Sequence, residues 1–204
     1  MLIPIKTPKI LFCLLFLFFG LTQAMNAQNN WSQNNKATKS ENGKILPNVV
    51  IILADDMGYA DLQGYGGVAN TPNLDALAAE GIKFTNCYAG APNCSPSRVG
   101  LLTGRIPARA GMYSYRPSGS AMHLPDNEVT IAELLKPAGY QTAHFGKWHL
   151  SVLPQDPDLN QPQPHQQGFD YSLGTENNAE PSHLNPVNFI RNGTPIGEQE
   201  GYSC

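Results

Sequence analysis

The chain has 204 residues, of which 41% are hydrophobic and 14% are charged, and its formal net charge is −3. This composition is that of a globular protein with enough apolar residues for one sizeable core. The negative charge repels polyanions, which excludes nucleic acid as a partner and requires that any anionic substrate be held by a local basic cluster.

The first 24 residues have the features of a cleavable secretory signal. Two lysines precede an apolar run over residues 10–21, and small residues follow at Ala24 and Ala27, the two candidate cleavage sites. The apolar run is short for a bilayer span, which favours a signal over the alternative, a transmembrane anchor. We therefore predict a signal peptide at 1–24, a periplasmic or secreted location, and no stable membrane anchor after cleavage.

Two changes in composition divide the rest of the chain. Residues 25–45 are dominated by Asn, Gln, Ser and Lys, which predicts a flexible linker. Beyond Leu150 the sequence turns to Pro, Gln and Asn, which predicts a long surface excursion. The chain stops at Cys204 without an obvious terminal element, so we expect 46–204 to be the N-terminal part of a longer catalytic domain.

Strands and helices are predicted to alternate between these limits. A β-branched run at 48–54 is typical of a strand buried on both faces, and Thr130 with Glu133 forms a capping box at a helix start. The predicted strands are 48–54, 82–88 and 140–145, and the predicted helices are 71–81, 96–103 and 130–139. This order indicates an α/β fold with a largely parallel central sheet flanked by helices, and ligand sites in such folds lie beyond the carboxyl ends of the strands.

The segment Cys94–Arg98 (CSPSR) carries the most chemical information. Pro96 suits the first position of a helix, so residue 94 is expected just before a helix N-terminus, where free N–H groups favour an anion. Arg98 follows four residues later and should lie on the same helix face. The alternative is a buried structural cysteine. With Cys87 and Cys204, Cys94 makes an odd number of thiols after signal removal, which indicates a spare reactive cysteine or a pairing with missing sequence.

Two further constellations follow predicted strands. Asp55 and Asp56 come directly after 48–54, and their carboxylates suit a hard cation if the strand ends there, although such a pair is also common in turns. Lys147 and His149 are two residues apart, so in an extended segment they would share a face at the end of the third strand. Without the other two segments, this pair would indicate only the solvent-exposed edge of a strand.

In this order the three segments resemble the type I, formylglycine-dependent sulfatases of the alkaline phosphatase superfamily. The resemblance implies that a maturation enzyme oxidises Cys94 to formylglycine. It implies a Ca²⁺ ion, with Mg²⁺ as the alternative, held by Asp55, Asp56 and the residue at 94. The substrate would be a sulfate ester, either a sulfated carbohydrate or an aryl sulfate.

The resemblance also assigns catalytic roles. Lys147 would contact the sulfate and the nucleophile, His149 would hydrogen-bond the formylglycine hydroxyls, and Arg98 would stabilise charge on the sulfate oxygens. One hydroxyl of the hydrate would attack sulfur and displace the alcohol, and the second would then lose its proton and expel sulfate, which regenerates the aldehyde. Two alternatives remain open: a phosphonate or phosphodiester hydrolase of the same superfamily, and a non-catalytic binding relative.

Sulfatases carry further machinery in their C-terminal portion. By the resemblance, this is a second Asp/Asn pair of metal ligands, a histidine that protonates the leaving group, and another lysine. None of these can be matched in this sequence. We therefore expect the 204-residue chain to be inactive by itself.

Overall fold

A computed structural model describes residue 43 and residues 46–152 and 160–203. The chain divides into two compact units, Met1–Asn48 and Val49–Cys204, and every helix and strand described belongs to the second. Apart from Gly43, the predicted signal peptide and linker lie outside the described residues, as does Cys204. None of the helices in the described ranges is long and apolar enough to cross a membrane.

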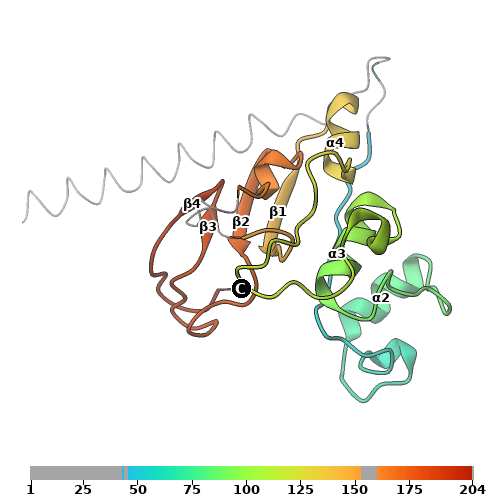
Figure 1. Ribbon diagram of the computed structural model, residues 1–204. Helices are drawn as coiled ribbons and strands as arrows, with labels where there is room; N and C mark the ends of the chain where they lie inside the picture. The colour runs from blue at the N-terminus through green and yellow to red at the C-terminus, as the bar shows by residue number, and fades with distance from the viewer. Residues whose placement is uncertain (1–42, 44–45, 153–159, 204) are drawn as a thin grey trace, which may run out of the picture. The chain divides into compact units, whose positions relative to one another are not determined.

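The elements of the second unit are shown in Figure 1. Within the described ranges its α-helices are α2 (Pro72–Glu80), α3 (Cys94–Thr103) and α4 (Ile131–Leu135). Its strands are β1 (Ala143–Lys147), β2 (Tyr171–Thr175), β3 (Ile190–Arg191) and β4 (Thr194–Pro195). Short 3₁₀ helices lie at Gln63–Tyr65, Pro107–Ala110, Lys136–Ala138 and Pro164–Gln166.

The strands form one sheet in the order β1-β2-β3-β4. β1 and β2 lie side by side and parallel, with Lys147 opposite Thr175 at their carboxyl ends (Figure 1). β2–β3 and β3–β4 are antiparallel. The predicted α/β class is confirmed, and the described part of the sheet is mixed because the short connection from β3 to β4 permits only antiparallel pairing, whereas residues 148–170 form a connection long enough for a parallel pair.

The predicted helices are confirmed with small shifts at their ends. α3 begins at Cys94, two residues earlier than expected, so Pro96 occupies the third helical position. Proline is tolerated there because the first N–H groups of a helix have no intrahelical partner. α3 ends where Gly104 takes a left-handed φ of 66°. At α4 the predicted capping box is complete: the Glu133 amide donates to Thr130 Oγ1 at 3.2 Å, and the Thr130 amide donates to the Glu133 carboxylate at 2.7 Å.

Two of the three predicted strands are absent from the described chain. Segments 48–54 and 82–88 have no strand assignment, and side chains such as Ile52 and Ile82 are 85% and 81% exposed. Both segments have strand-forming residues, but a strand exists only when a neighbouring strand takes up its backbone hydrogen bonds, and neither segment pairs with a described strand. The third predicted strand is present as β1, displaced toward Lys147.

The hydrophobic core lies among α3, α4 and the residues that follow β1. Its buried members share one contiguous cluster: Val99, Ala110, Met112, Leu124, Ala132, Trp148, Leu150 and Phe169. The prediction of a surface excursion beyond Leu150 was wrong for residues 160–175, where Gln161, Gln163 and Gln167 are buried, whereas most residues described from 176 onward are exposed or half-buried. The amides of these glutamines satisfy main-chain groups internally; Gln163 Nε2, for example, donates to the Val152 carbonyl at 2.6 Å.

Candidate active site

Three residues far apart in the sequence meet at one point. The Asp55 carboxylate accepts from Arg98 Nη2 at 3.1 Å and from Lys147 Nζ at 2.9 Å. Arg98 Nη1 also donates to the Lys147 carbonyl oxygen at 2.6 Å. Each residue therefore contacts the other two, and an acid that follows one predicted strand is joined to bases from a helix and from the end of β1.

The local sequence explains how these side chains reach one another. Lys147 is the last residue of β1, at the carboxyl end of a parallel strand, where the sequence predicted a ligand site. Arg98 lies on α3, four residues after Cys94, so both belong to one helix face. Arg98 is 9% exposed, and Cys94 is a free, half-buried cysteine at the start of the helix. Arg98, the member of the Asp55–Arg98–Lys147 cluster on α3, therefore lies on the same helix face as residue 94.

His149 belongs to a second, buried network. It is 2% exposed, its Nε2 lies 2.8 Å from the Arg116 carbonyl oxygen, and its amide donates to the Glu176 carbonyl at 2.6 Å. Its φ is 57°, so the chain is not extended there, and the expectation that Lys147 and His149 share a face of an extended segment was wrong. Left-handed backbone at a non-glycine residue is strained and persists only where surrounding contacts hold it, as these do.

Arg116 joins this network to the start of α3, and no sequence motif predicted this role. The Arg116 amide donates to Ser95 Oγ at 3.0 Å, directly beside residue 94. Its guanidinium is fully buried, pairs with Glu176 and donates to the Ser120 carbonyl at 3.2 Å. Arg116 stands in no recognisable motif, and its partner Glu176 is far away in the sequence. Only the tertiary structure identifies it.

Charge and burial set the protonation of two groups. Partial burial alone would raise the pKa of Asp55, but hydrogen bonds from Lys147 and Arg98, together with their charges, hold that pKa below its usual range. Burial lowers the pKa of His149, opposed by its hydrogen bond to the Arg116 carbonyl and reinforced by the nearby positive charges. At neutral pH, Asp55 is therefore ionised and His149 is neutral.

The neutral imidazole of His149 has a defined tautomer. Nε2 faces a carbonyl acceptor, so it carries the proton, and Nδ1 is left as an acceptor. Nδ1 is buried and has no hydrogen-bond partner within the described part of the chain. A buried acceptor without a partner is costly, which favours a site where a donor from a substrate or a modified residue completes it.

The predicted metal ligands fit a hard cation in part. Asp55 and Asp56 supply carboxylate oxygens, and the left-handed φ of 57° at Asp56 turns the chain at that point. Among the residues described, no group of three or more His, Cys, Asp or Glu is placed to hold an ion, and Asp56 makes no ion pair. The two carboxylates and an oxygen at residue 94 would supply part of a Ca²⁺ shell, and Asp55 would exchange cationic side chains for the ion.

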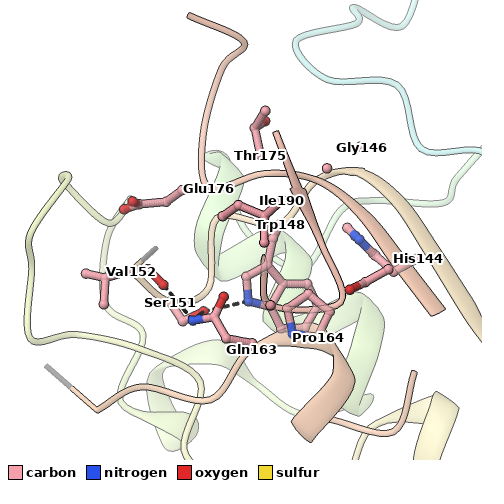
Figure 2. Close-up of a pocket in the computed structure, with 13 residues that line it drawn as sticks. His144, Gly146, Trp148, Ser151, Val152, Gln163, Pro164, Thr175, Glu176 and Ile190 are labelled. Carbon is pink, nitrogen blue, oxygen red and sulfur yellow. Dashed lines mark hydrogen bonds between the residues drawn. The ribbon is translucent and has the colours of Figure 1, made fainter. Parts of the chain in front are cut away.

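Cavities of very different size adjoin β1 in the described structure. The larger measures about 640 Å³ and carries Asp55, Arg98 and Lys147 among otherwise mainly apolar walls. That size suits a small-molecule site, although neither Cys94 nor His149 is among its described lining residues. The smaller, shown in Figure 2, measures about 20 Å³ and is bounded by Trp148 and Glu176 among others. It has room for one water molecule and none for a substrate.

Comparison with known proteins gives a consistent result. The sulfatase family model matches residues 47–199. The chain is 50% identical to human arylsulfatase A over 130 residues, which cover 63% of this chain and 25% of that protein. It is 45% identical to human N-acetylgalactosamine-6-sulfatase over 140 residues, with 64% and 26% covered. The chain thus spans about a quarter of the curated relatives that it matches.

Comparison with solved structures leads to the same family. The crystal structure of Ps i-CgsB superposes with a TM-score of 0.62 and 32% identity over 74% of this chain and 37% of that one. A structure from Bacteroides thetaiotaomicron, described in connection with the metabolism of multiple glycosaminoglycans, gives a TM-score of 0.57 and 38% identity over 70% and 30% of the two chains. These superpositions extend the sequence similarity to the fold itself.

Proposed function

The chain belongs to the sulfatase family, and from this premise we propose that the complete protein hydrolyses sulfate esters with residue 94 as its nucleophile. One observation carries the proposal: Asp55, Arg98 and Lys147 converge within hydrogen-bonding distance, and Arg98 lies on α3 four residues after Cys94. An anionic ester needs such a local cluster of positive charge, because the protein as a whole is negative.

The contacts of Arg98, Lys147 and His149 suggest a role for each in the reaction. Arg98 and Lys147 both donate to Asp55, and the same donors would bind oxygens of a sulfate group, whose charge grows on those oxygens as the ester bond breaks. Within the described part of the chain the Nδ1 acceptor of His149 has no partner, which suits a hydrogen bond from a hydroxyl at residue 94. The cations therefore bind the substrate, and the imidazole orients the nucleophile.

Two chemical groups would complete the site. Formylglycine made from Cys94 would supply, as its hydrate, one hydroxyl for attack on sulfur and a second through which sulfate leaves. A Ca²⁺ ion on Asp55, Asp56 and residue 94 would supply positive charge beside the sulfate. Asp55, held ionised by its basic neighbours, is ready to accept that ion at neutral pH. Maturation requires a formylglycine-generating enzyme as a partner.

The names of the relatives support a sulfated carbohydrate or aryl sulfate as substrate. One is an N-acetylgalactosamine-6-sulfatase, another is an arylsulfatase, and a similar structure is linked to glycosaminoglycan metabolism. We further propose export, by way of the signal predicted at 1–24, to the periplasm or the exterior, where sulfated polysaccharides are encountered.

The proposal is tested with the complete protein, co-expressed with a maturation enzyme, on matched aryl sulfate and aryl phosphate esters. We expect turnover of the sulfate with a kcat/KM at least about 100-fold above that for the phosphate, and loss of turnover on removal of calcium. The 204-residue chain, assayed in parallel, should be inactive. A preference for the phosphate ester would assign the protein to a related phosphohydrolase, and binding without turnover would indicate a non-catalytic relative.

A further inference from the structure

We infer that Arg116 is a positioning residue of this site, which holds the residue beside the nucleophile and the imidazole of His149 at a fixed separation. The inference rests on the proposed function for its catalytic consequence but on contacts for its geometry. Arg116 lies outside every motif that resembles the family, and its hydrogen bonds and ion pair in the described structure go to residues other than Asp55, Arg98 and Lys147.

The main chain of Arg116 forms the bridge. Its amide donates to Ser95 Oγ at 3.0 Å, and its carbonyl accepts from His149 Nε2 at 2.8 Å. One peptide segment therefore fixes both the first turn of α3 and the imidazole ring. The second bond also fixes the tautomer, because a carbonyl accepts only from a protonated ring nitrogen, and Nδ1 is left as the acceptor that would face residue 94.

The side chain of Arg116 holds this main chain in place. Residues 112–123 contain no helix or strand, so no regular backbone ladder holds the segment. The guanidinium instead anchors it, through an ion pair with Glu176 and hydrogen bonds to the Ser120 carbonyl and to Gln161 Oε1 at 3.4 Å. The contacts close a ring, because the carbonyl of the same Glu176 accepts from the His149 amide at 2.6 Å.

A purely stabilising role does not account for this arrangement. Burying an ion pair gains little net stability, since desolvation offsets the attraction between the charges. The guanidinium is 0% exposed, and its Nε has no partner in the described residues, so it is an expensive way to anchor a loop. What the pair does provide is one fixed orientation of the two side chains, because a planar guanidinium donates its hydrogen bonds only in narrow directions. Fixed direction is what a hydrogen bond to a nucleophile requires.

The test uses the complete, matured protein with the double substitution Arg116→Met/Glu176→Gln, which removes the pair without leaving a buried charge. The double substitution Arg105→Met/Glu128→Gln is the control, because it removes another Arg–Glu ion pair, one whose arginine is half-exposed and whose ion pair joins no residue of the Asp55–Arg98–Lys147 cluster. Formylglycine content is measured by mass spectrometry, so that kcat is expressed per matured molecule.

Three readouts are compared: kcat and KM on an aryl sulfate, the melting temperature, and the ¹⁵N chemical shifts of the His149 ring nitrogens. We expect the Arg116 variant to lose kcat on the order of 100-fold with KM changed less than about threefold. We also expect the His149 signals to move from one tautomer to a mixture. The control should keep wild-type kcat and His149 signals, even if it melts at a lower temperature.

A kcat within about twofold of wild type, or unchanged His149 signals, would overturn the inference. If the double variant does not fold, Arg116→Lys replaces it; this variant keeps the buried charge but loses the fork, and about a 10-fold loss of kcat with altered His149 signals is expected. Wild-type kcat and His149 signals in Arg116→Lys would also overturn the inference. If the wild-type protein hydrolyses no sulfate ester, the proposed function fails, and the His149 spectra alone decide the positioning role.

Discussion

The region around the start of α3 and the segment at 49–54 show opposite relations between polarity and burial. Around α3, polar side chains are enclosed: Arg116 is 0%, His149 2% and Arg98 9% exposed. At 49–54, apolar side chains are open to solvent, with Val50 at 80% and Ile52 at 85%. Charge pairing and hydrogen bonds hold these polar side chains together within the described residues, whereas β-branched residues form a strand only when a neighbouring strand is present.

The sharpest way to break the polar region is to remove its nucleophile. Cys94→Ala eliminates the thiol from which the reactive oxygen would be made, and we expect kcat/KM of the complete protein on an aryl sulfate to fall by at least roughly 10⁴-fold. Cys87→Ala is the matched control, because Cys87 is also a free thiol but is exposed, and it should retain wild-type kinetics. Activity that survives Cys94→Ala would show that residue 94 is not the nucleophile.

Arg98→Lys tests whether the geometry of the polar region matters beyond its charge. Arg98 donates from two nitrogens to Asp55 and to the Lys147 carbonyl, and a lysine has one nitrogen with which to replace them. We expect kcat/KM to fall about 100- to 1,000-fold. Arg109→Lys, on an exposed arginine, is the control and should have no effect. Equal activity in the two variants would mean that charge alone is enough.

His144 packs against the apolar core and also lies near the charge of Arg98, so it tests how burial affects a titrating group. Its ring packs edge-on against Trp148 at 5.2 Å between centroids, and burial, assisted by the charge of Arg98, lowers its pKa from 6.5 to about 4. Between pH 6.5 and about pH 4, His144 is protonated in the unfolded chain but neutral in the folded chain, so the free energy of unfolding falls as the pH drops. The free energy of unfolding should lose roughly 3 kcal/mol from this residue between pH 7 and pH 4.

Urea denaturation of wild type and of His144→Phe at the two pH values measures this contribution. The variant keeps an aromatic ring against Trp148 but has no titrating group, so its pH dependence should be shallower by that amount. Identical pH dependence in the two proteins would show that His144 titrates normally in the folded state.

The smallest effect is expected in the apolar segment. Ile52→Ser should change the free energy of unfolding of the 204-residue chain by no more than about 0.5 kcal/mol, because its side chain is 85% exposed. Leu124→Ala, in the core at 0% exposure, should cost about 3 kcal/mol in the same urea titrations. A large loss from Ile52→Ser would mean that this segment is packed in solution and does not differ from the polar region in burial.

The sequence predicted those features that depend on residues close together in the chain. Thr130 and Glu133 specified a helix start, and the interval from Cys94 to Arg98 placed two side chains on one helix face. The three resembling segments were enough to nominate Asp55, Lys147 and the other site residues, and the family assignment is confirmed. Local rules of helix geometry and capping act over a few residues, so they can be read without a structure.

Features that depend on residues far apart in the chain could not be predicted from the sequence. The strand expected at 48–54 requires a neighbour that propensity does not specify, and the left-handed conformation of His149 is imposed by Arg116 and Glu176. A charged residue such as Arg116 has a strong prior for the surface, which only its pairing across the fold overturns. For the same reason the sequence suggested a surface excursion where Gln161 is buried.

The central claim is that residue 94 supplies an oxygen nucleophile, and mass spectrometry of the proteolytic peptide that spans it is the most direct test. In the complete protein, purified after co-expression with a maturation enzyme, the account predicts a peptide that has lost sulfur and carries an aldehyde at this position, in proportion to the specific activity of the preparation. An intact thiol at residue 94 in protein that turns over sulfate esters would contradict it.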